Sequence, residues 1–190
     1  MPRSGVDMNK IVMLAAAITD EKGIEAVTLK EIGRQLNVSS PSLYNHIKGL
    51  PELKECVSHY AMKQLKECLV RAVTGHSGIE ALKEMGRAYI QFAREHTGLY
   101  ETIQWINIAA DGQGESLFAE VVKQVYDIAA GFGADETEAS HIIRTVRSLA
   151  HGFASVESHQ GFSHSSSVES SYEYAIESFF AGVKMRTAKD

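Results

Sequence analysis

Apolar residues recur along most of this chain at the spacing of an α-helix, and this spacing is the feature that most constrains the fold. Ile11, Leu14 and Ile18 are the first instance, since residues three, four and seven apart share one face of a helix. No convincing stretch of five or more residues alternates apolar and polar side chains between turn signals, so no β-strand is expected. We therefore expect an all-α fold of about nine helices, at residues 8–22, 29–36, 40–47, 51–73, 79–92, 98–105, 117–128, 136–158 and 168–185.

Composition and charge exclude several classes of protein. The chain of 190 residues has 15 glycines and three prolines, too few for collagen-like or proline-rich material. No run of about 18 apolar residues could cross a bilayer, and residues 1–7 lack the apolar stretch of a secretory signal, so a cytoplasmic protein with no membrane partner is expected. The net charge is −5, but residues 1–54 carry seven basic and six acidic side chains. This uneven distribution weakly favours phosphate contact near the N-terminus.

The most specific pattern in the chain is a pair of short helices joined by a tight turn, at residues 28–47. Thr28 and Glu31 have the spacing of a capping box, in which each side chain accepts a hydrogen bond from the other residue's backbone amide. Gly33 is the small residue that two steeply crossing helices need where they touch. Asn37 is among the few residues that adopt a positive φ at low cost. The pattern therefore predicts a helix-turn-helix over residues 29–47.

The second helix of this pair is expected to present polar side chains to solvent. Ser40 is the expected N-cap, and Val38, Leu43 and Ile47 are expected to point into the core. The other positions carry hydroxyl, amide and imidazole groups, which suit base edges and phosphates in a DNA major groove. From the residues alone, the alternative is a plain helical hairpin with polar caps. The expected outward side chains are Ser39, Ser40, Ser42, Tyr44, Asn45 and His46.

Residues 11–54 resemble the N-terminal domain of the TetR/AcrR family of bacterial transcriptional regulators. The likeness is close through Thr-Leu-Lys-Glu-Ile at 28–32 and Leu-Tyr-Asn-His-Ile at 43–47. It implies a three-helix DNA-binding domain at residues 1–50, and a ligand-binding and dimerisation domain at residues 51–190. In that family, residues matching Thr28, Tyr44 and His46 commonly contact phosphates, and those matching Ser40, Ser42 and Asn45 tend to face bases.

The chain departs from the family pattern at one expected DNA contact. A lysine usually opens the fourth helix, and this chain has Leu50 there, so Lys48 is expected to substitute for it. The predicted DNA-binding residues are therefore Thr28, Ser39, Ser40, Ser42, Tyr44, Asn45, His46 and Lys48.

Two C-terminal helices are expected to form a homodimer. Residues 136–158 and 168–185 carry apolar side chains on wide arcs, including Ile142, Phe153 and Phe179. A monomer would expose part of these arcs, whereas a two-fold four-helix bundle would bury them, and members of the resembled family pair through their last two helices. The alternative is that both helices only cover their own core. Two-fold symmetry would require recognition helices about 34–36 Å apart and a near-palindromic operator.

The middle of the chain is expected to bind a small apolar or aromatic effector. Residues 147–153 and the pair Gly161-Phe162 are similar to one C-terminal subgroup of the family, in which a tryptophan and a His-Gly pair recur. The resemblance implies a cavity enclosed by the middle helices. The alternative for each candidate is a place in the core, with His151 tying helices together by hydrogen bonds. The predicted ligand-binding residues are Tyr89, Phe92, Tyr100, Trp105, Phe118, Val122 and His151.

The sequence thus predicts a ligand-responsive repressor of transcription that is not an enzyme and uses no cofactor or metal. Hydrolase, P-loop and dinucleotide-binding motifs are absent from the sequence. Two alternatives from other classes remain. One is a DNA-organising protein of the same fold without an effector, and the other is a metal sensor built on Glu157, His159 and His164.

Overall fold

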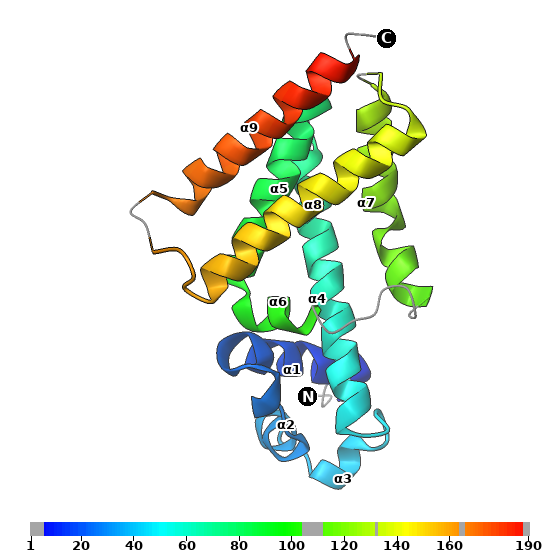
Figure 1. Ribbon diagram of the computed structural model, residues 1–190. Coiled ribbons are helices and arrows are strands. Elements are labelled where there is room, and N and C mark those ends of the chain that lie inside the picture. Colours follow the sequence, from blue (N-terminus) through cyan, green and yellow to red (C-terminus); the bar gives the residue numbers. More distant parts are fainter. Residues whose placement is uncertain (1–5, 104–111, 132, 164–165, 188–190) are drawn as a thin grey trace. The chain divides into compact units, whose positions relative to one another are not determined.

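The structure is a computed structural model that describes residues 6–103, 112–131, 133–163 and 166–187. Every regular element within these ranges is a helix, which confirms the predicted all-α fold (Figure 1). The elements are α1 (Met8–Lys22), η1 (Ile24–Ala26), α2 (Leu29–Leu36), α3 (Ser40–Leu43), α4 (Leu50–Val73), α5 (Gly78–Glu95), α6 (Thr97–Ile103), α7 (Gly112–Ala130), α8 (Glu136–Ser158) and α9 (Val168–Thr187).

The first of two compact units contains residues 1–64 and 96–114. Asp7 is the N-cap of its helix α1, and the Asp7 carboxylate accepts a hydrogen bond from the Lys10 amide (2.8 Å). Gly23 caps the other end of the helix, with a φ of 80°. The core of this unit is apolar and includes Ile11, Ala15, Ile18, Val27, Ile32, Leu43, Ile47, Leu53, Val57, Leu99 and Tyr100.

Helix α6 packs closely against α1 in this unit. A Cβ on Gly98 would lie 1.9 Å from the Thr19 carbonyl oxygen, so only glycine fits at this crossing. Next to it, Nδ1 of His96 lies 2.6 Å from Oδ2 of Asp20. The two contacts fix the start of α6 on α1.

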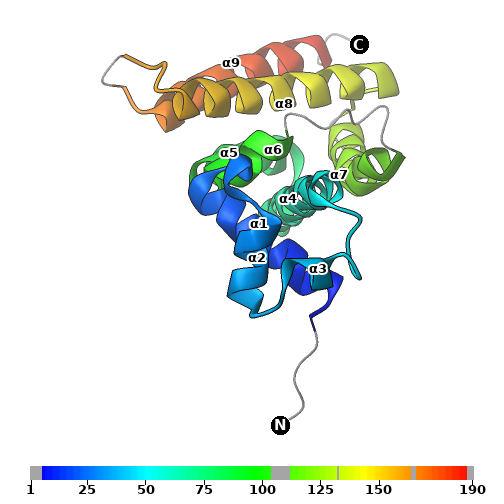
Figure 2. The ribbon, with the colours of Figure 1, turned by 90° about the horizontal axis from the view of Figure 1, so that it is seen from below.

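The second compact unit contains residues 65–95 and 115–190. Helix α5 packs against both α8 and α9, and α8 and α9 lie side by side with opposite chain directions (Figures 1 and 2). The core of this unit includes Leu65, Leu69, Leu82, Met85, Ile90, Phe92, Val121, Val125, Ile142, Val146, Tyr172, Ile176 and Phe180.

The boundary between the two units lies within one helix. It falls between Gln64 and Leu65 of α4, so this 24-residue helix contributes to both units. The predicted DNA-binding domain at residues 1–50 and ligand-binding and dimerisation domain at residues 51–190 are defined by function and not by contacts. This functional division stays a prediction.

Candidate nucleic-acid interface and ligand sites

The start of α2 carries half of the predicted capping box. Thr28 has extended backbone angles, and its Oγ1 accepts a hydrogen bond from the Glu31 amide (3.2 Å). The Glu31 carboxylate does not complete the box as predicted, because it instead accepts from Arg34 (2.8 Å to Nε) and Gln35 (2.7 Å). The hydrogen bond from Arg34, followed by that from Gln35, lowers the pKa of Glu31 to about 2. An alcohol oxygen that accepts a hydrogen bond still has its own O–H to donate, so Thr28 can contact a phosphate while it caps α2.

The turn between α2 and α3 has the geometry that the sequence predicts. Asn37 adopts the left-handed conformation (φ 54°, ψ 44°), and the Val38 amide donates to the Gly33 carbonyl (2.9 Å). A Cβ added at Gly33 would lie 2.8 Å from the Val38 carbonyl oxygen and 3.4 Å from the Ser40 amide nitrogen. Gly33 is therefore the close-contact position of the pair, as predicted, and it sets how near α3 lies to α2.

Helix α3 is shorter than predicted. It begins at Ser40, so Ser39 and not Ser40 occupies the N-cap position, and its α-helical part ends at Leu43. The amides of Tyr44, Asn45 and His46 then bond to carbonyls three residues earlier, so the chain continues as tighter turns up to the core residue Ile47. Leu43 and Ile47 are buried, as predicted, and Val38 is half-buried.

Most of the predicted DNA-binding side chains of this region share an exposed surface. Ser39, Ser42, Tyr44, Asn45 and His46 are all exposed, with 57% of Tyr44 accessible to water. The hydroxyls of Ser39 and Ser42 bond to each other (2.7 Å), which orients both at the start of α3.

Ser40 does not point outward as expected. It is half-buried, and its hydroxyl donates to the Leu29 carbonyl oxygen (3.4 Å). Its position in the first turn of α3 faces α2 across Gly33, where the missing side chain leaves room for the hydroxyl. Ser40 therefore belongs to the contact between the two helices.

Lys48 lies just before α4 with its side chain 92% exposed. Its Nζ is 3.8 Å from a Glu52 carboxylate oxygen, and its backbone amide donates to the same carboxylate. Leu50 is the half-buried first residue of α4 and carries no charge to this surface. Lys30, which the sequence pattern did not single out, is also exposed, two residues after Thr28.

Two of the predicted ligand-binding side chains, Tyr89 and His151, lie together in the described part of the chain. Oη of Tyr89 on α5 lies 3.3 Å from Nδ1 of His151 on α8, with the rings edge to face. Burial, helped by the nearby charge of Arg147, lowers the pKa of His151.

The other ligand candidates are scattered or undescribed. Phe92 and Tyr100 are buried but belong to different compact units, and Val122 is 39% exposed. Trp105 and the side chain of Phe118 lie outside the described residues. The contact between Tyr89 and His151 joins two side chains of the predicted aromatic cavity.

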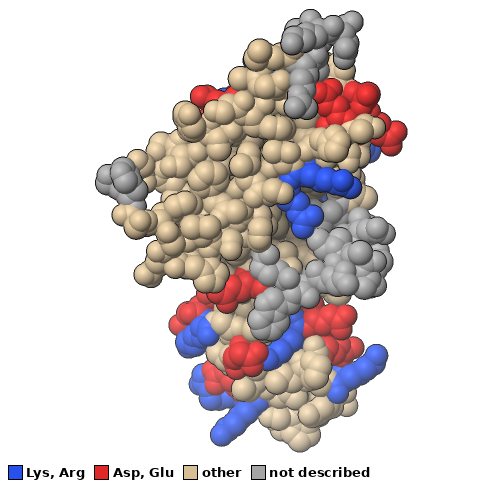
Figure 3. Space-filling model, viewed as in Figure 1, with Lys and Arg blue, Asp and Glu red and all other residues tan. Residues whose placement is uncertain are grey.

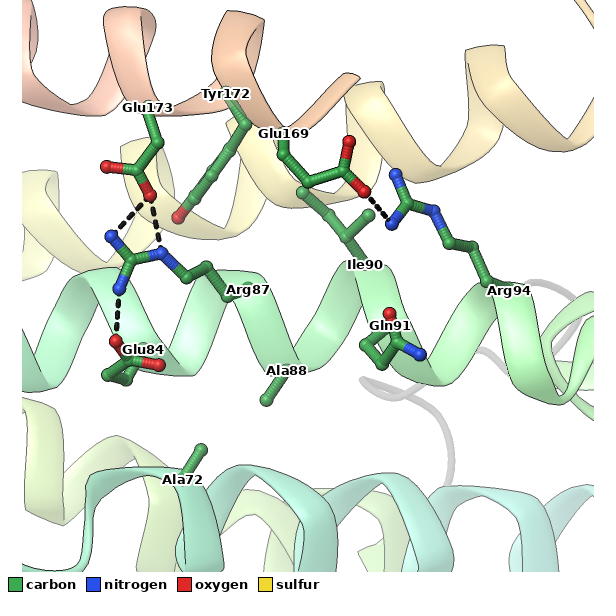
Figure 4. Close-up of a pocket in the computed structure, with 10 residues that line it drawn as sticks. All are labelled: Ala72, Glu84, Arg87, Ala88, Ile90, Gln91, Arg94, Glu169, Tyr172 and Glu173. Carbon is green, nitrogen blue, oxygen red and sulfur yellow. Dashed lines mark hydrogen bonds and ion pairs between the residues drawn. The ribbon is translucent and has the colours of Figure 1, made fainter. Parts of the chain in front are cut away.

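A pocket of about 380 Å³ lies elsewhere in the second unit, against α4, α5 and α9 (Figure 4). Sequence reasoning missed it, and none of the predicted ligand residues lines it. Arg87 is paired there with Glu84 and Glu173, and Arg94 with Glu169. The pocket is lined by Ala72, Glu84, Arg87, Ala88, Ile90, Gln91, Arg94, Glu169, Tyr172 and Glu173.

Tyr172 is the most unusual of these lining residues. Its side chain is fully buried, yet its hydroxyl oxygen has no hydrogen-bond partner. The hydroxyl packs against Gly86, where an added Cβ would be only 1.7 Å from it. Burial raises the pKa of Tyr172, so the hydroxyl is neutral at physiological pH. An unsatisfied buried hydroxyl costs about 1–3 kcal/mol, and a mid-helix glycine costs about 1 kcal/mol relative to alanine.

The described residues were also searched for membrane-spanning helices and metal sites. None of their helices combines the length and hydropathy needed to cross a membrane. They contain no group of three or more His, Cys, Asp or Glu side chains placed to hold a metal, and His164 of the proposed metal-sensor set lies outside them.

Comparison with known proteins decides the family. Residues 11–48 match the family described as "Bacterial regulatory proteins, tetR family", and residues 82–179 match "Tetracyclin repressor-like, C-terminal domain". The chain belongs to the TetR family. The Trp/His-Gly subgroup within the TetR family stays a prediction.

Similar proteins cover the chain almost from end to end. It is 31% identical to the uncharacterised HTH-type transcriptional regulator YobS of Bacillus subtilis, over 96% of this chain and 95% of YobS. A Rhodococcus protein of unknown function has the same fold, with a TM-score of 0.80 and 20% identity over 96% of this chain and 98% of that one. BioQ with its double-stranded DNA operator matches with a TM-score of 0.65 and 20% identity, over 95% and 99% of the two chains. The two solved structures thus share the fold of this chain along nearly its whole length.

Proposed function

We propose that this TetR-family chain is a homodimeric repressor that binds a near-palindromic operator and releases it when a small apolar or aromatic effector binds. The observation that carries the DNA-binding part is the exposed polar set on α3 and its following turn, held in place by the close contact at Gly33. The fold shared with BioQ, whose structure contains its operator, supports the same role.

Each exposed group has a proposed part in DNA binding. Thr28, Tyr44 and His46 contact phosphates, and the ammonium group of Lys48 takes the place of the lysine that Leu50 replaces. Asn45 and Ser42 contact base edges, since an amide can pair with adenine and a hydroxyl with several bases. Ser39 supports Ser42 through the hydroxyl–hydroxyl bond of 2.7 Å. Ser40 has no direct DNA contact in this proposal.

The dimer is proposed to form through α8 and α9. Figure 3 shows a broad area without charged side chains over these two helices. Val156 (40%), Tyr174 (78%) and Met185 (67%) are large apolar or aromatic side chains that the two helices leave exposed. A second copy packed on the uncharged area would form a four-helix bundle.

The effector is proposed to act by favouring one of two states of the dimer. It would bind near Tyr89 and His151, where an aromatic ring and an imidazole come together. A ligand shifts such an equilibrium only if it binds one state more tightly. The factor by which the ligand lowers the affinity for DNA then equals the factor by which DNA lowers the affinity for the ligand. The helix α4 is suited to transmit the change because it contributes residues to both compact units. We also still predict that the chain regulates transcription by binding alone, without catalysis. A cytoplasmic location stays a prediction as well.

Selection of bound sequences from random duplex DNA tests the proposal. We expect a near-palindrome with half-sites one helical turn apart, together with sedimentation of a dimer. A single unrepeated site or a monomer would contradict the dimer. Selection without any sequence preference would instead favour the DNA-organising protein.

A further inference from the structure

Two glycines inside long helices have no explanation within the single chain. Gly152 lies in α8 and Gly182 lies in α9, where glycine weakens a helix relative to alanine. A Cβ added at either position would meet nothing within 4 Å, and neither residue has a positive φ. Alanine would therefore fit both positions in one chain and would favour both helices.

The other glycines that the structure describes each have a local reason. Some lie against atoms that an added Cβ would meet within 4 Å, namely Gly33, Gly86, Gly98, Gly131 and Gly161. The others have a positive φ, which side chains rarely adopt, namely Gly23, Gly49, Gly75, Gly78 and Gly133. Among the described glycines, a need for glycine at positions 152 and 182 would thus arise outside the single chain.

Both glycines lie on the outer sides of their helices. The buried side of α8 includes Val146 and Ala150, and that of α9 includes Ile176 and Phe180. Residues three or four apart share one side of a helix, so the spacing gives the neighbours of each glycine. Each glycine and its three neighbours form what we call a small-residue side, and neither side contains a charge. The neighbours are Thr145, Ser148 and Ser155 for Gly152, and Ser171, Ala175 and Ser178 for Gly182, all half-buried or exposed.

The two small-residue sides let another helix approach the backbone closely. Packed helices have axes about 8–10 Å apart, and the side chains at the contact set this distance. Glycine allows the closest approach because it has no Cβ. Each of the two helices therefore offers a short stretch beside its glycine on which a helix from outside the chain can pack against the backbone.

A second copy of the chain is the occupant that suits these sides. In a two-fold contact the same surface meets itself, so a charged surface would bring like charges together. Figure 3 shows a broad area without charged side chains over α8 and α9. The acidic residues of α9 pair instead with basic residues of α5, in the pairs Glu169–Arg94, Glu173–Arg87 and Glu177–Lys83. An acidic or basic partner protein would find no countercharge on the small-residue sides.

We infer that the closest contacts of the homodimer lie at Gly152 and Gly182, where helices of the partner subunit pack directly on the backbone of α8 and α9. The inference rests on the proposed dimer and names the residues that set how near the two copies come. It gives Gly152 of the His-Gly pair a role separate from that of His151, whose ring contacts Tyr89 on α5.

Sedimentation equilibrium of the full chain over a range of concentrations tests this inference. Gly152→Leu and Gly182→Leu should each weaken dimerisation about tenfold or more, because the added side chain holds the partner's helix away. Ala17→Leu adds a similar bulk at an exposed position of α1 and should leave dimerisation unchanged. Unchanged dimerisation in both glycine variants would overturn the inference and leave the proposed dimer intact. A wild-type chain that stays monomeric would overturn both.

Alanine variants separate the contact from folding. Gly152→Ala and Gly182→Ala should keep the wild-type helix content by circular dichroism, because the methyl group meets nothing within the chain. They should still weaken dimerisation, by roughly threefold each, because the helices of the partner subunit must move outward. Intact helices with unchanged or tighter dimerisation would mean that no helix of a second copy packs at these positions, and would overturn the inference.

Discussion

At the scale of single residues, the clearest determinant of the DNA-binding surface is a missing side chain. Gly33 lies so close to the next turn that one added carbon would come within 2.8 Å of a backbone oxygen. The neighbouring Asn37 supplies the left-handed residue that reverses the chain. Both were predicted from the sequence, because the residue types that tolerate these positions are few.

Gly33→Ala should destabilise the chain, since the Val38 carbonyl in the turn must move to admit the methyl group. We expect a loss of about 1–3 kcal/mol in the free energy of unfolding, measured by urea denaturation. Gln35→Ala on the same helix is the control, and its exposed side chain should cost less than about 0.5 kcal/mol. Equal losses for the two variants would show that the contact at Gly33 tolerates an extra carbon.

Lys48→Ala should weaken binding to the selected operator and to random DNA by similar factors. The proposed phosphate contact releases a counterion, so the slope of log affinity against log salt should become shallower by about 0.9. Lys123→Ala, which removes an exposed lysine paired with Asp127 on α7, should leave the slope unchanged. An unaltered slope in Lys48→Ala would mean that Lys48 does not replace the family lysine.

Asn45→Ala should have the opposite pattern, with a loss confined to the operator. A good base contact is worth about 1–3 kcal/mol of discrimination, so sequence preference should fall while affinity for random DNA is kept. Fluorescence anisotropy with both duplexes measures the ratio. Equal losses on both duplexes would reassign Asn45 to a phosphate.

At the scale of elements, helical periodicity predicted the observed helices well, and the errors have physical causes. The second helix of the pair is predicted to end near Ile47, but the amides of residues 44–46 form tighter turns and the regular helix ends at Leu43. The pocket was not predictable, since it depends on pairs such as Arg87 with Glu173, which are 86 residues apart in the chain. Periodicity describes one helix at a time and carries no information on which charged faces meet.

The contact between α5 and α8 predicts a pH dependence of stability. The pKa of His151 is lower in the folded chain than the ordinary value of 6.5, so the unfolded chain binds the proton more readily. Stability is therefore retained above about pH 6.5 and falls as the pH is lowered through the folded pKa. His151→Gln should lose less unfolding free energy than the wild type between about pH 7 and pH 5, measured by urea denaturation. His141→Gln, which changes an exposed ring on the same helix, should retain the wild-type loss.

At the scale of the whole molecule, the proposed function depends on symmetry that one chain does not contain. The uncharged face of α8 and α9 suits a second copy, and pairing there would fix the separation of two recognition elements. The predicted near-palindrome follows from that separation, because each copy would read the same half-site in opposite directions.

An operator with altered spacing tests this symmetry directly. Inserting about 5 base pairs, half a helical turn, between the selected half-sites turns one of them to the opposite side of the duplex. A rigid dimer can then engage only one half-site, so affinity should fall nearly to that of random DNA, whereas the same insertion outside the half-sites should have no effect. Retained affinity for the split operator would mean that each chain binds DNA independently. The uncharged surface of α8 and α9 would then need a different explanation from dimerisation.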